Sequence, residues 1–334
     1  MSVGDAYELL KSNGYPRTFV QKLLPEWWDN SLLKTSSGAL QFALIIKQRL
    51  GLEVYFSEEG SLCLTEDHFT ARFKHRKNTH QDELSVVKNI GKAAASIANH
   101  IAPEYSKLPN TPIELRKHIM QKTNCTDVNL EGLLEVCWSH GIPVLFLETL
   151  PRGAKRMTGM IVNHNGRPSI LLGFRHNHKA RQLFVLAHEL AHLLLGHVND
   201  ETLLIDEDLD SEVETLNEEI ETTLDSEEAE ADKFALDLIR GRHELSFAHL
   251  NPDQPTELAV FAMQESEQHG IDPGHIIASY AFETMDWPTA NTAMNFFENS
   301  GEAINCIKSV FSEKALLENI SEEAQSYLHM LQGS

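Results

Sequence analysis

The sequence has few of the features that mark membrane proteins or disulfide-stabilised proteins. Its four cysteines are scattered and form no Cys-x-x-Cys pair, which argues against both a disulfide framework and a cysteine zinc site. No apolar run reaches the ~18 residues that a membrane-spanning helix needs. The first residues lack the basic and apolar segments of a secretory signal. We therefore expect a cytoplasmic protein with no membrane partner.

Basic residues are missing from one long stretch. Residues 199–232 contain 16 Asp and Glu and no Lys or Arg, which leaves −5 of the net charge of −21 for the rest of the chain. This balance disfavours non-specific nucleic-acid binding by the whole chain. Residues 1–110 are nearly neutral, with 13 basic and 12 acidic residues. Direct nucleic-acid binding by that part is therefore left open.

The residues most informative about chemistry lie in one apolar stretch, 181–197, which is predicted to be a buried helix ended by Gly196. It contains His188-Glu189-Leu190-Ala191-His192, an H-E-x-x-H pattern. Residues four apart share one face of a helix, so His188 and His192 can bind one Zn²⁺, and Glu189 can reach a water on that metal. Two histidines bonded to backbone in an ordinary core helix are the alternative reading of this pattern alone.

A second predicted helix, residues 225–241, offers the third zinc ligand. Glu228 and Asp232 are four residues apart, which suits one carboxylate on the metal and one that holds the far nitrogen of a ligand histidine. We interpret Glu227 and Glu230 as solvated surface residues.

Together, these two motifs resemble the ImmA/IrrE family of zinc metallopeptidases. That family combines H-E-x-x-H with a Glu three residues before an Ala-(Asn/Asp)-x-Phe-Ala string, and Glu228 has this offset from the string that begins at Ala231. The resemblance covers roughly residues 127–240. It implies a zincin-like domain, a zinc held by His188, His192 and Glu228, and Glu189 as the general base. It also implies a strand beside the cleft to which peptide substrates add, and a regulatory role in which a helix-turn-helix transcriptional repressor is cleaved during stress responses.

For the whole chain we predict an α+β fold that is predominantly helical. The zincin-like metallopeptidase domain would span residues 111–245, with a small antiparallel sheet that contains a hairpin turning over residues 163–166. An acidic insertion at about 199–225 would contain a mobile loop near 206–210 and an amphipathic helix. A mainly helical N-terminal domain, 1–105, could be helix-turn-helix-like or partner-binding, and residues 246–334 would form a helical C-terminal region.

Several points stay open at the sequence level. One alternative is a DNA-binding transcription regulator with a structural zinc, and another is an antitoxin-like binding protein with a non-catalytic zinc site. Three protein ligands favour catalysis over a structural role, because structural zinc sites usually have four. The sequence does not select a residue to stabilise the oxyanion, and it does not fix the oligomeric state. The candidates for the oxyanion role are His176, His178, His243 and Tyr280.

Overall fold

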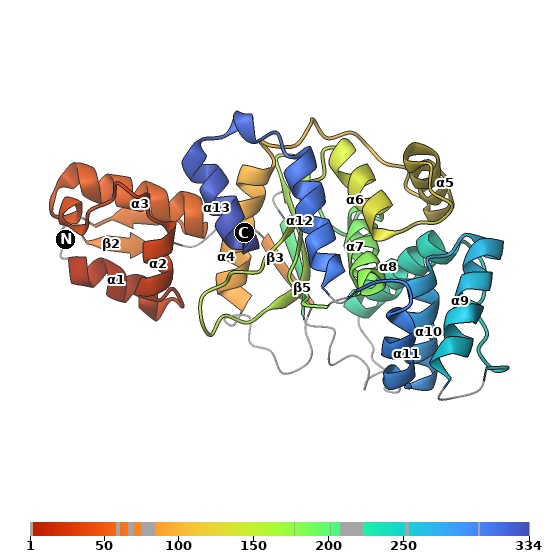
Figure 1. Cartoon of the computed structure of the whole chain (residues 1–334). Coiled ribbons are helices and arrows are strands. Elements are labelled where there is room, and N and C mark those ends of the chain that lie inside the picture. The colour runs from red at the N-terminus through yellow and green to blue at the C-terminus, as the bar shows by residue number, and fades with distance from the viewer. Residues whose placement is uncertain are drawn as a thin grey trace.

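The computed structural model describes most of the chain. The described residues are 3–57, 61–65, 70–74, 84–176, 178–200, 202–207, 223–250, 254–299 and 301–333. Helices surround a central sheet and extend beyond it on both sides (Figure 1). The predicted α+β, predominantly helical fold is confirmed.

The central sheet has five strands in the order β3-β7-β5-β6-β4. Strand β5 is antiparallel to both of its neighbours, whereas the outer pairs β3–β7 and β4–β6 are parallel. The sheet is therefore mixed, where a small antiparallel one was expected. Its strands are β3 (Thr70–Lys74), β4 (Val144–Phe146), β5 (Met157–His164), β6 (Arg167–Leu172) and β7 (Thr202–Glu207).

The hairpin between β5 and β6 turns at Asn165 and Gly166, the last two of the four residues predicted to separate its strands. Asn165 and Gly166 have φ values of 55° and 67°, as a two-residue type I′ turn requires. This turn fixes the register of the pair, so that Ile161 lies opposite Ile170.

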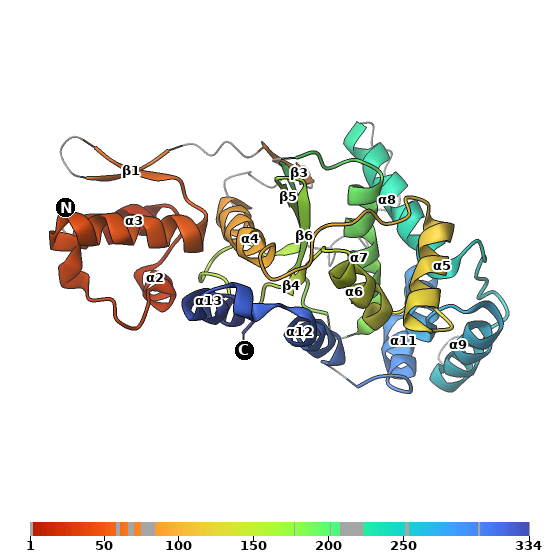
Figure 2. The same cartoon turned by 90° about the horizontal axis from the view of Figure 1, so that it is seen from above.

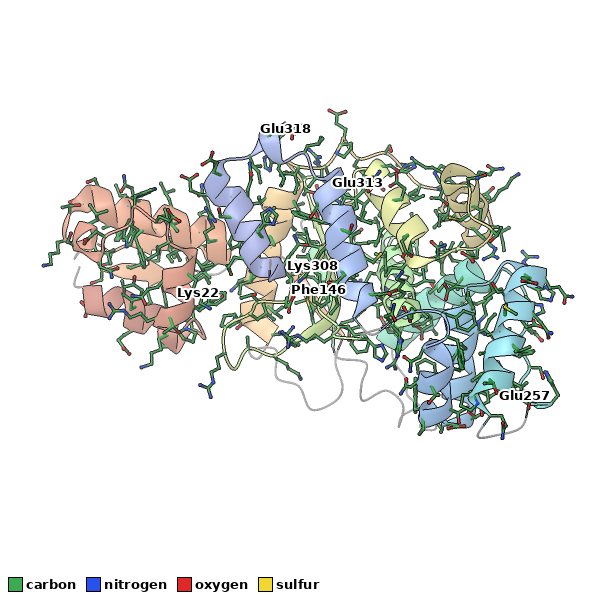
Figure 3. All side chains as sticks on the ribbon, viewed as in Figure 1. Lys22, Phe146, Glu257, Lys308, Glu313 and Glu318 are labelled. Carbon is green, nitrogen blue, oxygen red and sulfur yellow. The ribbon has the colours of Figure 1, made fainter. Side chains whose placement is uncertain are left out.

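Helices cover the sheet on both faces (Figure 2). Helix α4 (Ser85–Ala98) packs on one face and α7 (Lys179–Leu194) on the other. Because side chains alternate along a strand, Leu203 and Ile205 of β7 join the core beneath α4, whereas Leu204 joins the core beneath α7. Figure 3 shows these packed interiors, with Phe146 of β4 near the centre of the molecule. The alternation places Asp206 on the α7 face.

The N-terminal part is a small helical unit with a hairpin. It consists of α1 (Val3–Ser12), α2 (Arg17–Leu23), the 3-10 helix η1 (Asn30–Lys34), α3 (Ser36–Leu50), β1 (Val54–Phe56) and β2 (Leu62–Leu64). The expected boundary near residue 105 does not separate it from the sheet, because β3 and α4 lie before that boundary and yet belong to the central sheet and its covering layer. Strand β3 pairs with residues 202–206, so no local pattern could reveal its partner.

The remaining helices surround the α7 side and the β4 edge. Helices α5 and α6 pack on each other, and α5 also packs on α8. Helices α9, α10 and α11 form a separate bundle with its own core, while α12 and α13 return to β4. The expected C-terminal helical region therefore divides into two parts. The bounds are α5 (Pro112–Thr123), α6 (Leu130–Ser139), α8 (Thr223–Arg240), α9 (Pro255–His269), α10 (Pro273–Thr284), α11 (Trp287–Met294), α12 (Glu302–Lys314), η4 (Leu317–Asn319) and α13 (Glu322–Gln332).

A search of the described helices for a membrane span found none that is both long enough and apolar enough.

Candidate metal centre

Helix α7 presents both motif histidines on the side that faces α8. The helix ends at Leu194, and Gly196, with φ of 78°, makes the left-handed turn that the sequence indicated. His188 and His192 are one helical turn apart, and their Nε2 atoms lie 3.0 Å from each other. The side chain of His192 is fully buried and that of His188 is 12 % exposed. Two imidazole nitrogens therefore converge on one point.

Glu228 of α8 brings a carboxylate to the same position, so that three side chains could hold one metal ion. Its Oε2 lies 3.1 Å from His188 Nε2, and its Oε1 lies 3.4 Å from His192 Nε2. Ligand atoms bound at 2.0–2.2 Å to a tetrahedral zinc lie about 3.3–3.6 Å from one another. The observed separations are close to these values, so the three side chains fit Zn²⁺ without a large movement.

The far nitrogens of both histidines have partners of their own. His188 Nδ1 is 2.8 Å from Asp232 Oδ1, which is the arrangement expected for a carboxylate that orients a ligand histidine. His192 Nδ1 is 2.8 Å from the Nδ1 of His197, a residue that the sequence analysis did not single out. With Nδ1 of His188 donating to Asp232, its Nε2 lone pair points at the other ligand atoms. That convergence of lone pairs and carboxylates calls for a cation.

The electrostatics of the site agree with this requirement. Burial lowers the pKa of His188, but hydrogen bonds and charge from Asp206 and Asp232 outweigh burial and raise the pKa to about 10. Without a metal, the site would therefore hold a proton on His188. A divalent cation can replace that proton and also balance the carboxylate of Glu228.

Glu189 lies on the side of α7 that faces the sheet. Its side chain is fully buried, and it is directed at Gly159 of β5. A Cβ atom added at Gly159 would lie 2.0 Å from Glu189 Oε1, so the absence of a side chain there makes room for the carboxylate. Glu189 neighbours His188 in sequence but is not one of the residues whose donor atoms cluster at the metal position. The structure thus places the Glu189 carboxylate in the interior, against β5, and outside the cluster of candidate ligand atoms.

Asp206 is a fourth carboxylate that the sequence analysis missed. Its Oδ2 lies 3.4 Å from His188 Nε2, and its ligand atom is within 4.8 Å of those of His188, His192 and Glu228. We expected a mobile loop near residue 206, inside an acidic insertion. This expectation is wrong for residues 206 and 207, which belong to strand β7, and Asp206 is buried there. Residues 208–222, with most of the amphipathic helix expected there, lie outside the described residues. The run Thr202-Leu203-Leu204-Ile205 was the available signal, hidden between acidic residues.

The resemblance implied that peptides add to the edge of a strand beside the cleft. Strand β5 offers no such edge, because it has β6 on one side and β7 on the other. The outer strands of the sheet are β3 and β4.

Glu230 is exposed, as expected, whereas Glu227 is only partly exposed. Glu227 forms an ion pair of 2.7 Å with Arg72 of β3, whose guanidinium also donates to the backbone carbonyl of His197. Glu230, 63 % exposed, lies 3.5 Å from His197 Nε2. Neither is in the ligand cluster, so Glu228 is the one glutamate of this helical turn within it.

The four candidates for oxyanion stabilisation have partners outside the metal centre. His176 stacks on Phe174, and burial lowers its pKa to about 3. Partners of the others are Glu298 for His178, Glu265 for His243 and Asp286 for Tyr280.

A pocket of 450 Å³ borders the site between α7, α8 and α10. Asp232, the partner of His188, is one of the residues that line this pocket. Its wall is largely apolar and includes Phe174, Phe184, Leu236, Phe247, Phe282 and Met285. Such a wall suits an apolar side chain of a bound peptide.

Comparison with protein families gives one match, which covers residues 137–239 and is described as the IrrE N-terminal-like domain, a peptidase family. The searches of curated proteins and of solved structures returned no match. The matched range runs from the end of α6 into α8. It includes Glu189, Asp206 and Asp232 together with the three expected ligands.

Proposed function

We propose that the chain is a zinc-dependent metallo-endopeptidase, because residues 137–239 match the IrrE N-terminal-like domain of a peptidase family. The observation that carries the proposal is the convergence of His188, His192 and Glu228, with separations of 3.0–3.4 Å between their ligand atoms. The buried carboxylate of Glu189 beside them adds the group that peptide hydrolysis needs.

In this proposal each side chain has one role. His188, His192 and Glu228 hold Zn²⁺, and Asp232 and His197 orient the two imidazoles. When bound, zinc lowers the pKa of a water and polarises the peptide carbonyl. Glu189 takes the proton from the attacking water and passes it to the leaving amine. Gly159 gives the Glu189 carboxylate the space for this movement.

We further propose that the substrate is one partner protein, and that the partner is a cytoplasmic helix-turn-helix repressor whose cleavage switches on stress-response genes. This finer proposal is supported by the resemblance of the two motifs to ImmA/IrrE peptidases. The exposed side of α3 agrees with a protein partner, since it carries Leu40 and Leu44, 57 % and 58 % exposed. An apolar helix face of this kind suits protein contact better than phosphate contact.

A second candidate function is favoured by Asp206. If Asp206 binds the metal permanently, the site has four protein ligands and is a structural zinc site in a non-catalytic regulator. Glu189 argues against this candidate. A structural site has no use for a buried carboxylate that is not a ligand, and burying one without a role is costly.

The test compares the zinc-loaded chain with Glu189→Gln. Each is incubated with a lysate of cells that express the chain, and new protein N-termini are identified by labelling and mass spectrometry. The same pair is prepared with Asp206→Ala, in case Asp206 restricts access to the metal. We expect Glu189→Gln to keep its zinc and to lose all cleavage, because an amide cannot accept the proton.

The absence of any Glu189-dependent cleavage, in both the native and the Asp206→Ala background, would rule out the peptidase. The identity of the cleaved protein tests the finer proposal separately. A cleaved protein that does not bind DNA would leave the peptidase standing and remove the repressor as its substrate.

A further inference from the structure

Strand β7 occupies the side of β5 that borders the catalytic residues. The two strands pair antiparallel from Asn163 opposite Thr202 to Gly159 opposite Asp206. Antiparallel addition to such a strand is a general way in which extended peptides bind to a sheet. While β7 is in place, its backbone fills the positions that an added peptide would take along β5.

The register of the β5–β7 pair places Asp206 close to the residues of the proposed active site. Asp206 is opposite Gly159, the residue against which the Glu189 carboxylate lies. Its side chain points to the α7 face, as the alternation along β7 requires, and only 8 % of the residue is exposed. It lies 3.4 Å from His188 Nε2, a separation typical of two ligands on one zinc.

We propose that Asp206 is the fourth ligand of the metal, so that β7 acts as an internal strand that keeps the peptidase site closed. This inference rests on the proposed function. A carboxylate oxygen is an ordinary zinc ligand, and four protein donors complete the tetrahedron and exclude a water. Residues 202–207 would thus occupy two positions that hydrolysis needs. The strand backbone takes the place of the peptide, and Asp206 takes the place of the attacking water.

Neighbouring contacts hold β7 in this place. Strand β3 pairs with β7 along its other side, from Thr70 opposite Thr202 to Lys74 opposite Asp206. Arg72 of β3 donates to His197 O and pairs with Glu227, which ties the outer strand to the end of α7 and to α8. Opening the site therefore requires β7 to leave β5 and Asp206 to leave the metal.

The experiment measures access to the metal directly. The chain is loaded with Co²⁺, and binding of acetohydroxamate, a chelating ligand that needs an open coordination position, is followed by visible absorption. The native chain is compared with Asp206→Ala and with Asp206→Asn, which keeps the shape of the side chain. Thr202→Val is the matched control, since it changes a buried polar residue of β7 on the same face, four positions away.

We expect acetohydroxamate to bind Asp206→Ala at least about tenfold more tightly than the native chain, a difference of 1.4 kcal/mol. Asp206→Asn should show the same direction, and Thr202→Val should match the native chain. Equal binding of acetohydroxamate to the native chain and to both Asp206 variants would overturn the inference.

The failures of the two proposals are distinguishable. If acetohydroxamate binding changes as expected, Asp206 is a ligand whether or not a variant cleaves protein, and the comparison with Glu189→Gln decides the peptidase separately. If the native chain cleaves protein and binds acetohydroxamate as tightly as Asp206→Ala, the peptidase stands and the closed site is wrong.

Discussion

The contact between Gly159 and Glu189 gives the sharpest test of how the general base is positioned. In Gly159→Ala the new Cβ would lie 2.0 Å from Oε1, 2.5 Å from Cδ and 2.7 Å from Cγ of Glu189. Real Cβ atoms essentially never approach another atom within 3.0 Å, so the carboxylate has to move by about 1 Å or more. A displacement of this size at a catalytic group costs about 10²-fold in rate.

The variant should keep its fold and its metal, because Gly159 is not a ligand and the collision is with a side chain. Overpacking at a buried position costs about 1–3 kcal/mol, which thermal unfolding would reveal. Ile161→Val is the matched control. It changes the same face of the same strand, costs about 0.5–1.5 kcal/mol and leaves Glu189 untouched.

Cleavage rates are measured at equal zinc content, in the Asp206→Ala background so that access to the metal is the same. We expect Gly159→Ala to lose about 10²-fold and Ile161→Val to stay near the parent rate. A Gly159→Ala chain that is folded, zinc-loaded and as fast as its parent would refute the assigned position of Glu189.

Two further predictions concern metal affinity. Asp232→Ala should weaken zinc binding by ~10–100-fold, since the residue orients His188. Glu227→Ala should leave zinc affinity unchanged and cost about 0–1 kcal/mol of stability through its pair with Arg72. Competition with a chromogenic chelator measures the zinc affinity of both variants, and an equal loss of affinity in the two would contradict these roles. In the metal-free protein the His188 pKa is raised from 6.5 to about 10, so the imidazolium stabilises the fold fully below pH 6.5, and this contribution is lost as the pH rises toward 10. Zinc affinity should instead increase as the pH rises, and binding should release about one proton between pH 7 and 9. Calorimetry in buffers of different ionisation enthalpy measures this release. If no proton is released, His188 is neutral before zinc binds.

The motif helices were predictable because their signals are local. The i, i+4 spacing of His188 and His192, the apolar stretch around them and Gly196 are all contained in residues 181–197, and the structure gives a helix ended by a left-handed glycine there. The same holds for the hairpin at Asn165, where the turn type follows from two adjacent residues.

Strand β7 and Asp206 were not predictable in this way. Four apolar or β-branched residues, beginning at Thr202, lie within a strongly acidic stretch, and composition favoured a solvated insertion. Their burial depends on pairing with β3 and β5, which are distant in sequence, so no periodicity within the segment reveals it. The role of Asp206 follows only from the register that places it opposite Gly159.

The domain boundary expected near residue 105 differs from the structure for the same physical reason. Helix α4 looks like part of a helical domain when read alone, because its Ala-rich apolar face does not show what will cover it. Only the pairing of β3 with β7 and the packing of α4 on the sheet assign both elements to the centre of the molecule.

Anomalous diffraction at the zinc absorption edge, from crystals of the native chain, tests the central claim most directly. The account predicts one strong peak between the Nε2 atoms of His188 and His192, with Glu228 and Asp206 as its oxygen ligands. Because such a peak depends on bound zinc and on nothing else in the chain, its absence at these residues in zinc-supplemented crystals would contradict the metal centre and the peptidase built on it.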